Sequence, residues 1–61
     1  MPVTEAEIRK QEIWNVEQLT KLGVSVRRAN RLWDIVDVPR TRELVSHGCD
    51  LEIALRITAL V

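Results

Sequence analysis

The sequence has little of what small proteins commonly use to hold themselves together covalently or through metal ions. Cys49 is the only cysteine among 61 residues, which excludes an internal disulfide and argues against a cysteine-rich zinc site. A chain of this size buries only about 60% of the surface that its unfolded form exposes, so its stability is marginal without further help. We therefore expect one domain, residues 1–61, stabilised by an efficient apolar core or by a protein partner.

Aromatic residues and long apolar runs are also scarce. Trp14 and Trp33 are the only aromatic residues, so Leu, Ile, Val and Ala must supply most of the core, and we expect both tryptophans inside it. No run approaches the 18 or more apolar residues of a membrane span. The first residues lack the basic segment and apolar run of a secretory signal, which predicts a cytoplasmic protein.

Residue patterns that carry catalysis are missing from the sequence. We find no Ser-His-Asp set, no paired carboxylates and no phosphate-binding loop, and His47 is the only histidine. The sequence therefore predicts a protein that is not an enzyme and that binds neither a metal ion nor a cofactor. Cys49 is expected to be a small buried apolar residue rather than a nucleophile.

The net charge of zero conceals a basic segment. Residues 18–33 contain four cations and no acid, whereas residues 1–17 and 34–61 each carry a net charge of −2. The cations of the basic segment are Lys21, Arg27, Arg28 and Arg31.

Capping residues predict where the first helices begin and end. Thr4 and Glu7 form a capping box, which predicts a helix from Glu5. Asn15 could cap a second helix from Val16, and a single helix over residues 5–22 is the alternative. Gly23 suits the left-handed conformation that ends a helix. Ser25 then caps a helix over residues 26–36.

The second half of the chain repeats this order of a helix-ending glycine followed by a capping residue. Because Pro39 restricts the residue before it, we expect the next helix to begin after it and to span residues 40–47. Gly48 ends that helix, with His47 at its carboxyl end, and Asp50 caps a last helix from Leu51 to the terminus. No segment alternates as a strand does. The predicted fold is all-α, a compact bundle of four to five short helices.

The two halves also match at a spacing of 25 residues. Both read Leu-x-x-x-Gly-[Val/Cys]-[Ser/Asp]-x-x-x-Ala-x-Arg-[Leu/Ile], beginning at Leu19 and at Leu44. Any two short helices joined by a glycine turn and a capping residue could share such a pattern. In either case the sequence predicts a helix-turn-helix near residues 15–36 and a second unit of the same geometry at the carboxyl end.

The segment from Leu19 to Leu32, with its Gly-Val-Ser turn and arginine-containing second helix, resembles the helix-turn-helix family of DNA-binding domains. It is most similar to the core motif of the MerR and phage-excisionase types. The resemblance implies that the helix after the turn contacts bases in the major groove, through arginine and asparagine side chains. The candidate DNA contacts are Arg27, Arg28, Asn30 and Arg31 on bases and Lys21 and Ser25 on phosphates.

Helical spacing divides that same helix into two faces. Five apolar residues should face the core: Val26, Ala29, Leu32, Trp33 and Val36. The arginines should be exposed, and the alternative to DNA contact is a solvated face paired with Asp34 or Glu17. Since four cations give weak DNA affinity, a DNA-binding chain of this kind should be a dimer.

The last predicted helix is apolar on nearly every side, which predicts contact with a protein on the side away from the core. The candidate interface residues are Leu51, Leu55, Ala59 and Leu60. The alternative is that the first helix of the chain covers them.

Two functions follow from these features. The first is a transcription or recombination regulator, of a phage or another mobile element, that binds double-stranded DNA through residues 26–36 and self-associates through its last helix. The alternative is an antiactivator or antirepressor that docks its apolar surface on a transcription factor. A structural domain of a larger assembly is a third option.

Overall fold

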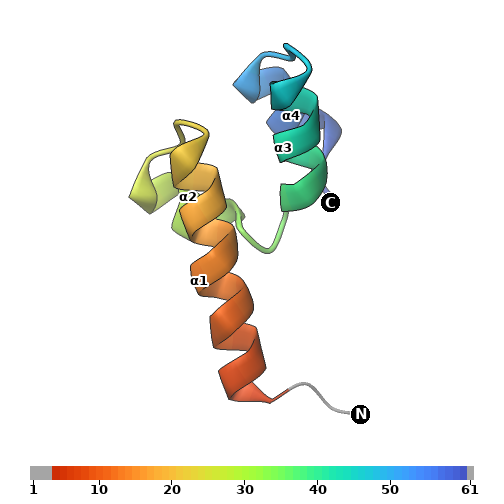
Figure 1. The fold of residues 1–61 in the computed structure, drawn as a ribbon. Coiled ribbons are helices and arrows are strands. Elements are labelled where there is room, and N and C mark those ends of the chain that lie inside the picture. Colours follow the sequence, from red (N-terminus) through yellow and green to blue (C-terminus); the bar gives the residue numbers. More distant parts are fainter. Residues whose placement is uncertain (1–3, 61) are drawn as a thin grey trace.

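Two consecutive helical hairpins make up residues 4–60, the part of the chain that the computed structural model describes (Figure 1). The first hairpin contains α1 (Glu5–Lys21) and α2 (Val26–Leu32), and the second contains α3 (Val38–Ser46) and α4 (Leu51–Ile57). Within residues 4–60 the only extended pairing is an isolated antiparallel bridge between Val36 and Ala59. The all-α prediction is therefore confirmed. The last residue of the predicted terminal helix, Val61, and the first three residues lie outside the described part.

Helix α1 is continuous, which settles the choice left open at Asn15. The Thr4 hydroxyl accepts a hydrogen bond from the Glu7 amide at 3.2 Å, as a capping box requires. Asn15 lies within the helix and does not interrupt it. A single helix over nearly the predicted range is thus the correct alternative.

The two hairpin turns have the same geometry. Gly23 and Gly48 both have positive φ, 110° and 92°, and within residues 4–60 no other residue does. After each glycine, the next amide donates to a carbonyl five residues back, from Val24 to Leu19 at 3.1 Å and from Cys49 to Leu44 at 3.0 Å. These are Schellman closures, in which glycine permits the left-handed residue. The 25-residue match therefore reflects a repeated turn.

Three predicted helix ends are wrong, by two to four residues. Helix α3 begins at Val38, because the Asp37 carboxylate accepts from the Arg40 amide at 3.1 Å and so caps it. Pro39 then lies in the first turn, where its missing N–H has no partner to lose. Helices α2 and α4 stop at Leu32 and Ile57 rather than at Val36 and the terminus.

The early ends of α2 and α4 let the chain join its two hairpins by backbone hydrogen bonds. The Asp37 amide donates to the Thr58 carbonyl at 2.9 Å, and the Leu60 amide donates to the Ile35 carbonyl at 2.6 Å. A helix running through these residues would use the same groups internally. Tertiary pairing thus overrides the local helical preference here.

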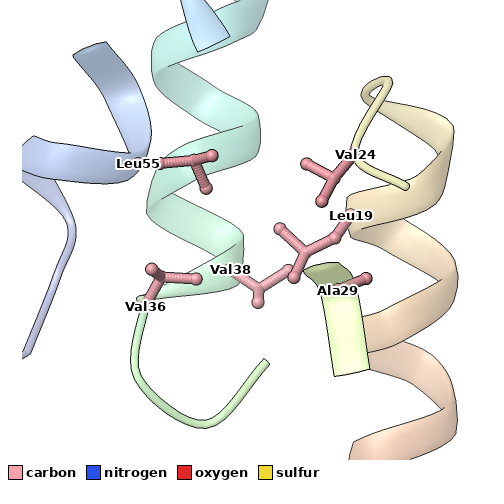
Figure 2. Close-up of a cluster of buried hydrophobic side chains, with 6 residues drawn as sticks. All are labelled: Leu19, Val24, Ala29, Val36, Val38 and Leu55. Carbon is pink, nitrogen blue, oxygen red and sulfur yellow. The ribbon is translucent and has the colours of Figure 1, made fainter. Parts of the chain in front are cut away.

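The core lies between the hairpins, and both contribute to it (Figure 2). α1 packs on α3 across this boundary, while α2 and α4 each pack on the preceding helix. The side chains of the central cluster point toward one another from both sides: Leu19, Val24, Ala29, Val36, Val38 and Leu55.

Most of the predicted core face of the second helix is correct. Ala29 and Val36 are buried, and Leu32 and Trp33 are half-buried against the central cluster. Val26 is wrong, because it is 62% exposed at the first position of α2. Trp14 is also wrong as a core residue. It is exposed on α1, and the Arg42 guanidinium lies 5.7 Å from its ring centre, a cation–π contact at the surface.

A buried pair of hydroxyls fastens α3 to the end of α4. The side-chain oxygens of Thr41 and Thr58 lie 2.7 Å apart, and both residues are almost fully buried. Each hydroxyl also lies 2.8 Å from a carbonyl of its own helix, that of Asp37 or of Ala54. Each hydroxyl has one proton to donate, so at any moment two of these three contacts are donated hydrogen bonds, and the two side chains form one connected network.

Replacing Thr41 with valine should destabilise the fold by about 1–2 kcal/mol, because the shape is kept while a buried hydrogen bond is lost. Thr58→Val should have a similar effect. The double variant should lose less than the sum of the two, because the shared bond can be removed only once. Urea unfolding followed by tryptophan fluorescence measures all three. Strictly additive losses would show that the two hydroxyls do not interact.

Candidate functional site

The basic segment lies at the first turn and along α2, and most of it is accessible. Arg27, Asn30 and Arg31 are exposed, and the two arginines are one helical turn apart. Within residues 4–60 neither arginine has an ion-pair partner. Ser25 is exposed too, and its hydroxyl caps α2 by accepting from the Arg28 amide at 3.2 Å.

Arg28 is held by an acidic residue of the second hairpin. Its guanidinium donates two parallel hydrogen bonds to the carboxylate of Glu52, the second at 2.6 Å. The hydrogen bonds that the Glu52 carboxylate accepts from Arg28 lower the pKa of Glu52, and the same bonds raise the pKa of Arg28. This bidentate ion pair links α2 to α4. Because Arg28 is engaged in it, Arg28 is less available to bind a ligand.

Lys21 also has an acidic neighbour. Its ammonium lies 3.2 Å from the Glu17 carboxylate, one turn back on α1. The pair is exposed, so its contribution to stability is small and salt screens it. Of the four cations in the basic segment, Lys21 and Arg28 are thus balanced by acids, and Arg27 and Arg31 carry its uncompensated positive charge.

The predicted interface residues of α4 and beyond divide between the inside and the outside. Leu55 is 5% exposed in the core, and Leu51 is half-buried against it, so the expectation that Leu55 lies off the core is wrong. Ala59 is exposed beside the bridge to Val36, and Leu60 is 68% exposed.

Two exposed isoleucines on the outer side of α4 are not among the interface residues predicted from the sequence. Ile53 and Ile57 are 53% and 59% exposed and lie one turn apart, on the side of the helix opposite buried Leu55. The 25-residue match places Ile53 where Arg28 stands in the first hairpin, which was available as a signal that this position faces outward. We call Ile53, Ile57 and the exposed Leu60 the α4 surface.

A second apolar surface, also unpredicted, lies between α1 and the start of α2. Ile13 and Val26 are each more than 60% exposed and line one groove. The rest of its lining is two half-buried side chains, one exposed amide and three charged residues: Val16, Thr20, Asn30, Arg9, Glu12 and Glu17. We call it the α1–α2 groove. It combines an apolar floor with charges of both signs at its edges.

The described residues offer no grouping suited to a metal ion or a membrane span. Within residues 4–60 no three His, Cys, Asp or Glu side chains converge as metal ligands would. None of the helices in the same part of the chain is long and apolar enough to cross a bilayer. Cys49 is half-buried in the second turn, where the repeat aligns it with Val24.

Comparison with known proteins does not assign the chain to a family. No protein-family model matches it, and neither curated proteins nor solved structures give a match.

The Arg28–Glu52 pair makes part of the stability depend on pH. Because the pKa of Glu52 is lowered in the folded chain, its contribution is present at neutral pH and is lost as the pH falls through that lowered pKa, below the ordinary value of 4.5. Glu52→Gln should therefore be less stable than the natural chain at pH 7, and this difference in unfolding free energy should be smaller at pH 3. Urea unfolding at the two pH values measures the difference.

Arg28→Gln is the matched control for that prediction. It removes the pair but leaves the Glu52 charge in the first turn of α4, where the helix dipole favours it. The difference in unfolding free energy between the natural chain and Arg28→Gln should likewise be smaller at pH 3 than at pH 7. A difference that stays constant from pH 7 to pH 3 in both variants would contradict the ionic origin of the effect.

Proposed function

We propose that the protein is a small cytoplasmic regulator that acts by binding another protein, with the α4 surface as its docking face. The observation that carries this proposal is the pair of isoleucines turned away from the core on a helix whose inner side is already packed. Ile53 and Ile57 form a ridge one turn long at the middle and end of α4. Covering such side chains is favourable at about 25 cal/mol per Å² of apolar area.

The neighbouring side chains define the chemistry of the partner. Arg56 is exposed between the two isoleucines, and arginine is enriched at protein interfaces. A helix ridge of this kind fits an apolar groove, and a carboxylate at the edge of that groove would pair with Arg56. Because the first hairpin resembles the helix-turn-helix of DNA-binding regulators, the proposed partner is a transcription factor, which this chain would bind as an antiactivator or antirepressor.

DNA binding through α2 is the second candidate. It is favoured by the exposure of Arg27, Asn30 and Arg31 on one helix, together with Ser25 as the N-cap of that helix and Lys21 at the end of α1. Two uncompensated arginines neutralise few phosphates, however, and the non-specific part of DNA affinity grows with that number. Pairing of Arg28 with Glu52 and of Lys21 with Glu17 therefore makes DNA the weaker proposal.

Site-specific photo-crosslinking tests the protein-binding proposal. A photoreactive amino acid at position 53 or 57, in cells that make the protein, should capture one defined partner, because both positions face outward. The same amino acid at position 11, an exposed position on α1, is the control and should not capture it. Ile57→Glu should abolish binding of the isolated partner while the helical circular dichroism stays unchanged. Equal capture from positions 11 and 57 would contradict the proposal.

A fluorescence titration with random-sequence duplex at low salt tests the DNA candidate. If α2 binds DNA, Arg27→Ala with Arg31→Ala should abolish binding, and the affinity of the natural chain should fall steeply as salt is added. Ile57→Glu should leave that binding intact. Absence of binding at high micromolar protein would rule the candidate out.

A further inference from the structure

We propose that two copies of the chain associate through the α1–α2 groove, with their α1 helices antiparallel and Ile13 at the two-fold axis. This surface lies in the first hairpin and is separate from the α4 surface. The proposal therefore stands independently of the one for partner binding.

The first half of α1 has little support from its own chain. Every residue from Glu5 to Gln11 is exposed, and the ribbon of this segment extends away from the other helices (Figure 1). A helical segment as short as residues 5–11 is marginal in water unless one of its faces packs against another part of a protein. A second copy laid along α1 would supply that packing to both chains at once.

One side of α1, exposed at Ala6, Arg9 and Ile13 and half-buried towards its carboxyl end, has the spacing of a helix–helix seam. Ala6, Ile13 and Thr20 recur every seven residues, and Arg9 and Val16 occur three residues after the first two of them. This alternation of three and four residues places all five on one stripe, as at a two-helix interface. Val26, at the start of α2, widens the apolar floor beside Ile13.

The charged residues at the edges of the groove make one copy of this surface complementary to a second copy of it. Arg9 precedes Ile13 by four residues, and Glu17 follows it by four. In an antiparallel pair centred on Ile13, Arg9 of each chain therefore faces Glu17 of the partner subunit, and symmetry forms this ion pair twice. The exposed contact of Glu17 with Lys21 at 3.2 Å leaves its carboxylate room for a second cation.

This self-complementarity is what identifies the occupant as a second copy. Arg9 and Glu17 lie at equal distances along the chain on either side of Ile13, so two copies of this surface related by a two-fold axis match each other in charge. The net charge of zero also means that two copies do not repel each other at long range. Antiparallel helices additionally place opposite dipole ends side by side.

Sedimentation equilibrium of the full chain over a range of concentrations tests the proposal. The natural chain should shift from monomer to dimer mass, and Ile13→Glu should weaken the dimer at least about tenfold while the helical circular dichroism is unchanged, since Ile13 is exposed. Gln11→Glu introduces the same charge on a different side of α1 and should leave the dimer intact. A natural chain that stays monomeric, or a dimer that survives Ile13→Glu, would overturn the proposal.

A charge exchange tests the antiparallel register itself. Arg9→Glu alone and Glu17→Arg alone should each prevent association, because both ion pairs then become repulsive. An equimolar mixture of the two variants should recover dimer mass, because every pair across the interface is then again opposite in charge. Two variants that dimerise separately, or a mixture that stays monomeric, would contradict the register. Neither result bears on partner binding at the α4 surface, which the photo-crosslinking measures.

Discussion

Neither hairpin has enough apolar surface to enclose a core alone, and the structure depends on the packing of one against the other. Leu19 and Val24 from the first hairpin meet Val38 and Leu55 from the second, and these side chains are nearly inaccessible to water. Hydrogen bonds between Asp37 and Thr58 and between Leu60 and Ile35 close the same boundary. In a chain of 61 residues this shared core replaces the disulfides and metal ions that its composition excludes or disfavours.

The shared core also determines which surfaces remain for partners. Because α4 turns Leu55 inward, Ile53 and Ile57 must point outward, and a helix that is apolar on both sides presents one of them to water. Because α1 is longer than the body on which it packs, its first half extends beyond the core with Ile13 exposed. Both apolar surfaces are thus consequences of how the core is built, and both are where we propose protein contacts.

Features set by neighbouring residues could be predicted from the sequence. The glycine turns and the caps at Thr4 and Ser25 depend on groups within a few positions of each other, and the structure confirms them. The start of α3 was missed because Pro39 was taken as a barrier, whereas Asp37 caps a helix that accepts proline in its first turn.

Features set by distant residues could not be predicted in the same way. The ends of α2 and α4 depend on pairing between residues 35–37 and 58–60. The pairing of Arg28 with Glu52 joins positions 24 apart and removes one candidate DNA contact. The sequence pattern instead offered Asp34 or Glu17 as the acids for the arginines of the basic segment. Which side of α4 faces inward is likewise decided by its packing on α3 and on the shared core, since apolar residues occur on nearly every side of the helix.

The most direct test of this account is a comparison of Leu55→Ala with Ile57→Ala by urea unfolding, followed through tryptophan fluorescence. Trp14 lies in α1 beside Arg42 of α3, and Trp33 follows α2 and packs against the shared core, so the signal reports on the first hairpin and its boundary with the second, while both substitutions lie in α4. We predict that Leu55→Ala destabilises the fold by about 2–4 kcal/mol and lowers the fluorescence midpoint, because a cavity opens in the shared core. Ile57→Ala should leave the midpoint nearly unchanged. A fluorescence midpoint that Leu55→Ala leaves unchanged, or that both variants lower equally, would contradict a core shared between the hairpins.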